Sequence, residues 1–195
     1  MNKLFPDILK PMKPFLKNEL ITLRALEPDD IDLLYTWENS EEIWTVSHTL
    51  APFSKHTLAL YIQQADKDIY ESKQLRMMIE NSEGTTVGSI DLFDFDPFHS
   101  RVGIGILVYR PEDRSKGVAT AALNLMIRYC FEKLNLHQIY ANILTDNDIS
   151  MKLFLKAGFV LAGSKKEWIR EGGMWKDENL LQLISTSTHH HISTS

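Results

Sequence analysis

The apolar residues of this chain change their spacing several times, and each change marks a predicted element. Residues 20–26 alternate between apolar and polar side chains, which predicts a β-strand. A proline and two aspartates within 27–30 then indicate the start of a helix. Apolar residues at helical spacing follow as far as Trp37, and a second helical stripe begins near Ser54. The N-terminal part therefore predicts one strand followed by two helices.

Three strands are predicted in the middle of the chain. Residues 75–80 and 86–93 flank the sequence Asn-Ser-Glu-Gly at 81–84, which favours a hairpin turn. A polar loop over 94–100 leads to 102–109, where a nearly continuous apolar run is typical of a buried central strand. The last of the three strands is therefore expected in the middle of a sheet.

The C-terminal part predicts alternating helices and strands that end in a hairpin. In chain order, the first three are a helix over 117–134, a strand over 137–144 and a helix over 149–156 that ends at Gly158. Two strands follow, one at 168–170 and one from 175, on either side of a turn at 171–173. The complete order is β-α-α-β-β-β-α-β-α-β-β. It predicts an α+β fold with a mixed, mostly antiparallel central sheet and flanking helices.

Length and composition indicate one domain with an extension at each end. The chain has 195 residues, of which 44% are hydrophobic, and this suits a single core. Residues 1–17 contain three prolines and predict an arm that lies on the domain or on a partner subunit. Residues 185–195 are of low complexity and predict a disordered tail. Three histidines in this tail could bind a metal, but a solvated tail is the simpler interpretation, so we predict no metal site. Between the arm and the tail, the predicted domain covers 18–184.

Charge and cysteine content exclude several classes of protein. Acidic residues outnumber basic residues by 26 to 21, which argues against a nucleic-acid binder and slightly favours cationic ligands such as amines. The N-terminus lacks the core of a signal peptide, and the longest apolar runs have the length of strands, so we expect no membrane span and a cytoplasmic location. The single cysteine, Cys130, has no histidine or acid at helical spacing, which favours a core residue over a nucleophile.

The segment most informative about chemistry connects the predicted central strand to the next helix. It contains Arg114, Gly117 and Ala119 in the pattern Arg-x-x-Gly-x-Ala. A glycine at a helix start allows a ligand close approach, and the unpaired amides there suit a pyrophosphate. A few hydrogen bonds to a charged group, at about 1.5–3 kcal/mol each, reach the scale of micromolar binding before association costs are subtracted. The alternative is an ordinary strand–loop–helix connection, and this short pattern alone does not decide between them.

A second pattern follows at 147–159, where the chain reads Asn-Asp-Ile-Ser-Met-Lys-Leu-Phe-Leu-Lys-Ala-Gly-Phe. Together the two segments resemble the GNAT superfamily, whose motifs are Gln/Arg-x-x-Gly-x-Gly/Ala and Asn-x-x-Ser/Ala-x-x-x-Tyr-x-x-x-Gly-Phe. The stretch Leu-Arg-Ala-Leu at 23–26 and the hairpin at 167–177 are similar to the branch that contains ribosomal-protein N-acetyltransferases and spermidine N-acetyltransferase. The resemblance covers roughly the whole predicted domain.

This resemblance implies an acetyl-CoA-dependent N-acetyltransferase in which the fourth and fifth strands splay apart and the pantetheine pairs with the fourth. The residues that match cofactor positions are Ile106, Leu107, Val108, Arg114, Ser115, Lys116, Gly117, Val118, Ala119, Thr120, Asn147 and Phe154. Simpler interpretations stay open, because 106–108 could be only core and Asn147 could be only the entry to a helix.

The chain departs from the family pattern at two positions that matter for catalysis. The usual general acid is the tyrosine of the second motif, and this chain has Phe154, which cannot donate a proton. Nearby members often carry a glutamate early in the fourth strand, where this chain has Gly103. Because a thiol with a pKa near 8.5 leaves readily, we expect impaired or solvent-assisted protonation of the leaving group; general acid help is typically worth about 10²–10⁴-fold.

The acceptor amine also needs a base, since a lysine-like amine has a pKa near 10.4 and costs about 4–5 kcal/mol to neutralise at pH 7. The candidates between the predicted third and fourth strands are Asp91, Asp94, Asp96 and His99, and we expect them close to where the acceptor enters. Asp91 alternates along its strand with Ser89 and Phe93 and could face the cleft, whereas His99 has a suitable ordinary pKa, near 6.5. Each has a simpler interpretation, as a solvent-facing strand residue and as a turn residue respectively.

Two functions follow from these observations. The first is direct acetyl transfer from acetyl-CoA to a primary amine, which could be a protein N-terminus, a polyamine or another small amine. The second is an acyl-CoA-binding module that has lost catalysis and acts as a sensor or subunit, as the departures at Phe154 and Gly103 suggest. The proline-containing arm and the late hairpin also offer surfaces for a homodimer.

Overall fold

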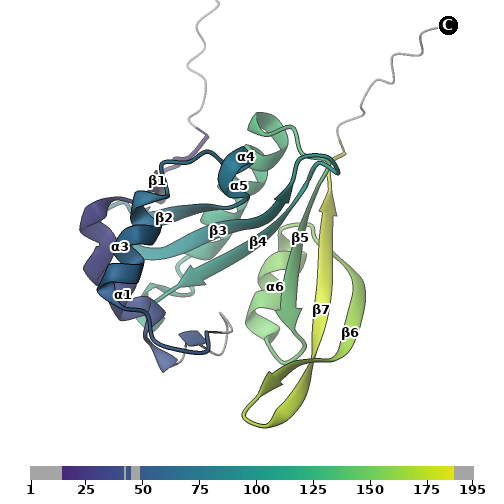
Figure 1. Cartoon of the computed structure of the whole chain (residues 1–195). Coiled ribbons are helices and arrows are strands. Elements are labelled where there is room, and N and C mark those ends of the chain that lie inside the picture. Colours follow the sequence, from purple (N-terminus) through teal and green to yellow (C-terminus); the bar gives the residue numbers. More distant parts are fainter. Residues whose placement is uncertain (1–14, 42, 45–48, 187–195) are drawn as a thin grey trace, which may run out of the picture.

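The protein is described by a computed structural model that covers residues 15–41, 43–44 and 49–186 (Figure 1). Within these residues, seven strands form one sheet in the order β1-β2-β3-β4-β5-β7-β6. The strands are β1 (Ile21–Ala25), β2 (Leu75–Asn81), β3 (Thr86–Asp96), β4 (Arg101–Val108), β5 (Gln138–Leu144), β6 (Val160–Glu171) and β7 (Met174–Ile184). Neighbouring strands are antiparallel except for β4 and β5. The predicted α+β class with a mixed, mostly antiparallel sheet is therefore confirmed.

Helices cover both faces of the sheet. They are α1 (Ile31–Glu38), α3 (Lys55–Gln63), α4 (Ile69–Ser72), α5 (Val118–Arg128) and α6 (Asp148–Lys156), with a π-helical turn over Tyr129–Lys133 and 3-10 turns over Pro28–Asp30 and Pro111–Asp113. In Figure 1, α1 and α3 lie over one face of the β1–β4 half, whereas α5 lies against the opposite face.

The alternation of side chains along β2 shows how one strand serves both layers. Met77 and Ile79 belong to the larger core cluster, together with Leu123 of α5. Met78, which lies between them in sequence, belongs to a second cluster with Leu34 of α1. Successive side chains of a strand point to opposite faces, so apolar residues at consecutive positions require a helix layer on each side.

Cys130 lies in the π-helical turn after α5 and is fully buried in the larger core cluster. Burial raises the pKa of its thiol to about 12. A buried thiol of this kind is not a nucleophile at neutral pH, so the prediction of a core residue is confirmed.

Several element boundaries differ from the predicted ones. β6 was predicted only at 168–170 but covers Val160–Glu171, because this edge strand is exposed along most of its length and lacks an alternating pattern. β3 continues to Asp96, which leaves only a short turn before β4. The short helix α4 was not predicted. Of the predicted arm, only residues 15–17 are described, and Phe15 packs on Arg128 with 5.3 Å between ring and guanidinium; residues 1–14 and 187–195 lie outside the described residues.

The junction of β4 and β5 determines where a ligand can enter. These parallel strands pair only at Arg101–Gln138, Val102–Ile139 and Gly103–Tyr140. β4 continues along β3 as far as Val108, whereas β5 continues along β7. The two strands therefore separate after Gly103, as Figure 1 shows. The half of the sheet from β1 to β4 and the half from β5 to β6 meet only at one end.

The close approach of β3 to β4 generates a prediction about Gly88. A β-carbon at this position would lie 2.1 Å from the backbone oxygen of Leu107. We therefore expect Gly88→Ala to push β3 away from β4 and to lower the free energy of unfolding by about 2–3 kcal/mol in urea denaturation. Gly163→Ala is the matched control, because a β-carbon at that strand position meets no heavy atom within 4 Å. Equal effects of the two substitutions would contradict this account.

Candidate active site

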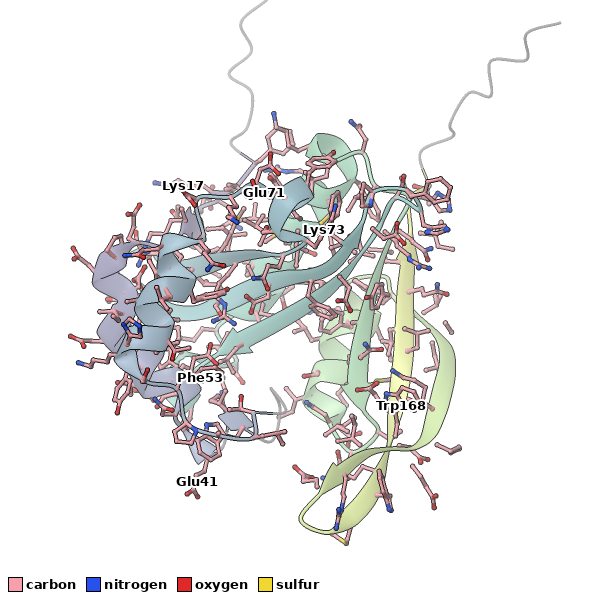
Figure 2. The ribbon with its side chains drawn as sticks, in the orientation of Figure 1. Lys17, Glu41, Phe53, Glu71, Lys73 and Trp168 are labelled. Carbon is pink, nitrogen blue, oxygen red and sulfur yellow. The ribbon has the colours of Figure 1, made fainter. Side chains whose placement is uncertain are left out.

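A cleft of about 760 Å³ lies where β4 and β5 separate. Residues 104–107 of β4 line one wall, and residues 141–144 of β5 line the other. The α6 helix contributes Ser150 and Phe154, and the residue that caps its start, Asn147, also lines the cleft. Figure 2 shows Trp168 on the half of the sheet from β5 to β6. It shows Glu41 and Phe53 on the opposite side of the opening. The cleft is thus bounded by both halves of the sheet.

The start of α5 has the geometry of an anion cradle. Gly117 has a φ of 82°, in the left-handed region that favours glycine, and it precedes the first helical residue. The first amide that bonds back into the helix is that of Ala121, which donates to Gly117 O at 2.9 Å. The amides of residues 118–120 therefore have no partner within the helix and point out of its positive end. This is the arrangement that a phosphate group requires.

Arg114 faces β4 and not the open cradle. Its Nε donates to Val108 O at 3.0 Å, and its Nη2 donates to Tyr109 O at 2.9 Å. The adjacent Asp113 is buried and accepts from Arg110 Nε at 2.9 Å. The loop is thus braced on both sides, and the guanidinium connects it to the end of β4. The sequence matches Arg114 to a cofactor position, whereas in the structure its donors contact backbone carbonyls.

Other residues that match cofactor positions lie along the cleft. Ile106 and Leu107 line it, while the side chains of Ile106 and Val108 also pack against the core. Asn147 caps α6, because its Oδ1 accepts from the amide of Ser150 at 3.0 Å. Phe154 is only 3% exposed and packs edge-to-face on another phenyl ring. Each of these side chains thus has the structural role that the simpler interpretation gives it. The residues also lie beside the open edge of β4.

Asp91 lies in the cleft within an ion-pair cluster that the sequence analysis missed. Arg76 of β2 contacts Asp91 through Nε at 2.6 Å and Glu38 of α1 through Nη1 at 2.5 Å. Its guanidinium also lies over the ring of Tyr61, 5.5 Å from the centroid. Burial alone would lower the pKa of Arg76, but Asp91, Tyr61 and Glu38 outweigh it and raise the pKa above its ordinary value. A signal was present, because Arg76 interrupts the apolar run at 75–79.

A second charged cluster lies on the opposite wall. The buried carboxylate of Glu178 on β7 contacts Lys165 of β6, whose Nζ also lies 3.2 Å from Asn142 Oδ1. The same ammonium lies 5.0 Å from the ring centroid of Trp168. Because β6 was predicted too short, the sequence analysis did not place Lys165 in a strand.

His99 does not reach the cleft. It lies in the exposed turn after β3, and its Nδ1 is 2.7 Å from Asp96 Oδ2. The continuation of β3 to Asp96 places this turn at the end of the sheet where β4 and β5 are still paired. The expectation that His99 lies close to where the acceptor enters is therefore wrong.

The ring of Phe93 explains the glycine at position 103. A β-carbon on Gly103 would lie 2.3 Å from this ring, which in turn packs edge-to-face on Tyr140 with 5.9 Å between centroids. Any side chain at position 103 would thus displace Phe93. At Gly105, by contrast, a β-carbon would be 3.8 Å from the nearest atom of the same ring, so this part of β4 is open.

Among the described residues, no group of three or more histidines, cysteines or acids is placed to hold a metal ion. Likewise, none of the described helices combines the length and apolar character needed to cross a membrane.

Comparison with known proteins gives consistent matches. Residues 21–160 match the family model of the acetyltransferase (GNAT) domain. A spermidine N(1)-acetyltransferase from Vibrio cholerae is 26% identical over 170 residues, which cover 87% of this chain and 95% of that protein. A putative ribosomal N-acetyltransferase, YdaF, from Bacillus subtilis is 27% identical over 175 residues, covering 82% and 88%. The solved structure of spermidine N-acetyltransferase from Vibrio cholerae with CoA and spermine has a TM-score of 0.77 at 26% identity, covering 86% and 96%.

The cluster around Arg76 generates a prediction about stability. In Arg76→Met, the carboxylates of Glu38 and Asp91 lose their shared partner in a partly buried site. We expect the free energy of unfolding to fall by about 2–3 kcal/mol at pH 7. Urea denaturation at pH 7 measures this effect.

Lys166→Met serves as the control for this experiment. Lys166 pairs with Asp177 at 2.7 Å, but its side chain is 76% exposed. A surface pair of this kind contributes about 0–1 kcal/mol. A loss in Arg76→Met that is equally small would contradict the interpretation of the cluster.

Proposed function

The chain belongs to the acetyltransferase (GNAT) domain family, and from this premise we propose that it acetylates small cationic primary amines in the cleft between β4 and β5. Acetyl-CoA is the acetyl donor. The observation that carries this function is the separation of β4 from β5 beside the start of α5. Because of this separation, the open edge of β4 continues to the anion cradle at the start of α5. A long thioester with a pyrophosphate at one end fits this arrangement.

The cradle and the open edge divide the binding of acetyl-CoA between them. We assign the pyrophosphate to the loop and helix start, where the amides of 118–120 point outward next to residues 115–117. The pantetheine then follows 106–108 of β4, with Asn147 on the other side of the cleft. Arg114 acts indirectly, because it holds the end of β4 at a fixed distance from the cradle.

The charges of the cleft support a cationic acceptor. Among the described residues, its lining carries three carboxylates, on Glu38, Asp91 and Glu178, and two cations, on Arg76 and Lys165, so these residues leave one negative charge over. A charge pair 4 Å apart at an effective dielectric of about 20 gains roughly 4 kcal/mol before desolvation. Relatives that are named for spermidine acetylation are consistent with such an acceptor.

Asp91 is our candidate for attracting the acceptor and removing its proton. It is paired in register with Gly105, whose missing side chain leaves the cleft face of β4 open at that point. Because Arg76 already contacts both of its oxygens, at 2.6 and 3.4 Å, we propose that the proton leaves through water near Asp91. The neutral nitrogen then attacks the thioester carbonyl and the C–N bond forms. The C–S bond breaks with its electron pair on sulfur, the nitrogen loses its second proton to water, and the thiolate takes up one proton from solvent.

A second function is favoured by one specific observation. Phe154 has no proton to donate, and the space beside Gly103 is filled by Phe93, so both family positions for proton transfer are apolar here. An acyl-CoA-binding module without catalysis would have the same appearance. Binding of CoA without CoA release from acetyl-CoA in the presence of any amine would establish this alternative.

Surface features support two further proposals. β6 is an exposed edge strand, and the hairpin that it forms with β7 exposes Trp168, Met174 and Trp175. Exposed edges and apolar patches are typical of interfaces, so we propose a homodimer through this hairpin. We also propose a cytoplasmic location, because the donor acetyl-CoA is an intracellular metabolite.

The role of Arg114 is tested by CoA affinity in calorimetry. In Arg114→Met, the loop loses the hydrogen bonds that hold it to the end of β4. Binding of CoA must then order the loop, at a cost of about 1–2 kcal/mol. The Kd for CoA should then rise roughly tenfold, and the unliganded protein should also lose stability. Arg170→Met on exposed β6 is the control and should change neither quantity. A weaker Kd with unchanged unliganded stability would mean that Arg114 contacts CoA directly.

The acceptor proposal is tested by CoA release with polyamines, an amino sugar and a peptide N-terminus. We expect release to be fastest with the cationic small amines. Asp91→Asn should raise the KM for the amine and lower kcat, each by about tenfold or more. Asp94→Asn is the control, because Asp94 lies on the same strand but outside the cleft and accepts from the Tyr140 hydroxyl at 3.3 Å. This substitution should leave KM and kcat unchanged. Equal behaviour of the two variants would exclude a role for Asp91.

A further inference from the structure

The two charged clusters of the cleft lie on the same face of the sheet. Arg76 and Asp91 are paired in register, and each alternates along its strand with residues of the larger core, which contains α5. Lys165 is paired with Glu178, which is paired in turn with the residue after the core residue Ile143. Because successive side chains of a strand point to opposite faces, both clusters lie on the face away from α5.

An acceptor that reaches the cleft from this face meets both clusters. The start of α5, where we assign the pyrophosphate, packs on the other face, so the donor and the acceptor approach from different sides. On the β1–β4 half, Asp91 is our candidate for attracting the reacting amine. The remainder of the acceptor then meets the β5–β6 half, where Lys165 lines the cleft.

Three different groups surround the ammonium of Lys165. The carboxylate of Glu178 contacts it, and Asn142 Oδ1 accepts from it at 3.2 Å. The ring centroid of Trp168 lies 5.0 Å from the same nitrogen. A carboxylate, an amide oxygen and the face of an indole each attract an alkylammonium ion. Lys165 therefore fills a site with the chemistry of an ammonium-binding pocket.

The occupant of this site lies between its carboxylate and the cleft. Glu178 is only 5% exposed, whereas the side chain of Lys165 is 30% exposed. Among the described residues, no other cation contacts the Glu178 carboxylate. Trp168 is exposed and lies on the half of the sheet from β5 to β6 in Figure 2. Removal of the Lys165 side chain would thus open a buried carboxylate to a ligand in the cleft.

A β-bulge holds Trp168 beside this ammonium. The register of β6 with β7 shifts between Lys165 and Ile169, and Glu167 within this stretch has a φ of 48°. Asp177 fixes the bulge, because its Oδ1 accepts from the amide of Glu167 at 2.9 Å. Bulges often redirect side chains beside functional sites. The irregular part of β6 is therefore the part that completes the ammonium site.

Other lysines of the same hairpin lack these features. Lys166 pairs with Asp177 and is 76% exposed, and Lys176 pairs with two other acids. None of these residues lines the cleft. A buried ion pair is often no more stabilising than apolar residues of similar volume, so stability alone does not account for the pair that Lys165 makes in the cleft.

We propose that Lys165 is a specificity-determining residue, whose ammonium fills a site that a second ammonium of the acceptor would otherwise occupy. This role rests on the proposed acetyl transfer. In the parent protein, Asp91 attracts the reacting amine, and the opposite wall carries its own cation. Without the Lys165 side chain, the carboxylate of Glu178 binds the distal ammonium of a diamine.

Chemical rescue tests the site without any need for catalysis. Lys165→Ala removes the stem beyond Cβ together with the nitrogen, which corresponds to one propylammonium ion. At about ten times its Kd, propylammonium should raise the Tm of this variant by about 3–6 °C, whereas 1-propanol should not. In the parent and in Lys166→Ala, neither compound should change Tm, since the site is filled.

A second variant shows whether Glu178 carries the effect. Lys165→Ala combined with Glu178→Gln has no carboxylate in the site, so propylammonium should not stabilise it. If Lys165→Ala does not fold alone, propylammonium should restore the folded state in circular dichroism. Equal stabilisation of the single and double variants, or no effect on the single variant, would overturn the ammonium site.

Acceptor choice is tested by CoA release with diamines and monoamines of equal chain length, over a series of lengths. In Lys165→Ala, the kcat/KM for the best diamine relative to its monoamine should rise about tenfold or more, as expected for one new bond between charged groups. Lys166→Ala should keep the ratio of the parent. A purely structural defect would lower kcat/KM for both acceptors alike, so an unchanged ratio in Lys165→Ala would overturn the role in specificity.

The two experiments distinguish failure of this inference from failure of the proposed function. A parent protein that releases no CoA with any amine would overturn the acetyl transfer and the role in acceptor choice, whereas rescue of Lys165→Ala would still establish the ammonium site. An active parent without rescue of Lys165→Ala would overturn only the inference.

Discussion

The separation of β4 from β5 after three residue pairs is the constraint on which the site depends. Parallel neighbours normally continue to pair, because unpaired backbone groups are costly when they are buried. Here each strand is held by its own half of the sheet. β4 follows β3 to Val108, where Arg114 donates to its carbonyl, and β5 is paired along its whole length with β7. The open edge is thus a stable feature that a pantetheine chain can satisfy.

The two halves of the sheet bring different chemistry to the opening. The β1–β4 half supplies the helix start that suits a pyrophosphate and the charged cluster around Arg76. The β5–β6 half supplies α6, with its row of Asn147, Ser150 and Phe154, and the ion pair of Lys165 with Glu178. A donor and an acceptor bound between the halves would each contact both, so the distance between their reacting atoms depends on how firmly the halves are joined at 101–103.

The sequence allowed correct prediction of features that depend on local pattern. These include the order of the main elements, the α+β class and the helix start at Gly117, because strand alternation and a glycine at a helix start are encoded by neighbouring residues. The family, too, followed from two short motifs, and the comparisons confirm it. Features that depend on distant residues were missed. The contact of Arg76 with Glu38 joins positions 38 residues apart, and no periodicity indicates it. The expectation for His99 was wrong because β3 is longer than predicted. Its extra residues place the turn that contains His99 at the end of the sheet where β4 and β5 are still paired.

Hydrogen–deuterium exchange of backbone amides, with and without CoA, tests the central claim most directly. If CoA lies in the cradle and along the open edge, the amides of 117–120 and of 104–107 should exchange more slowly in its presence, while those of β1 and β2 should not change. Protection confined to other segments, or unchanged exchange at the start of α5 under saturating CoA, would contradict the account.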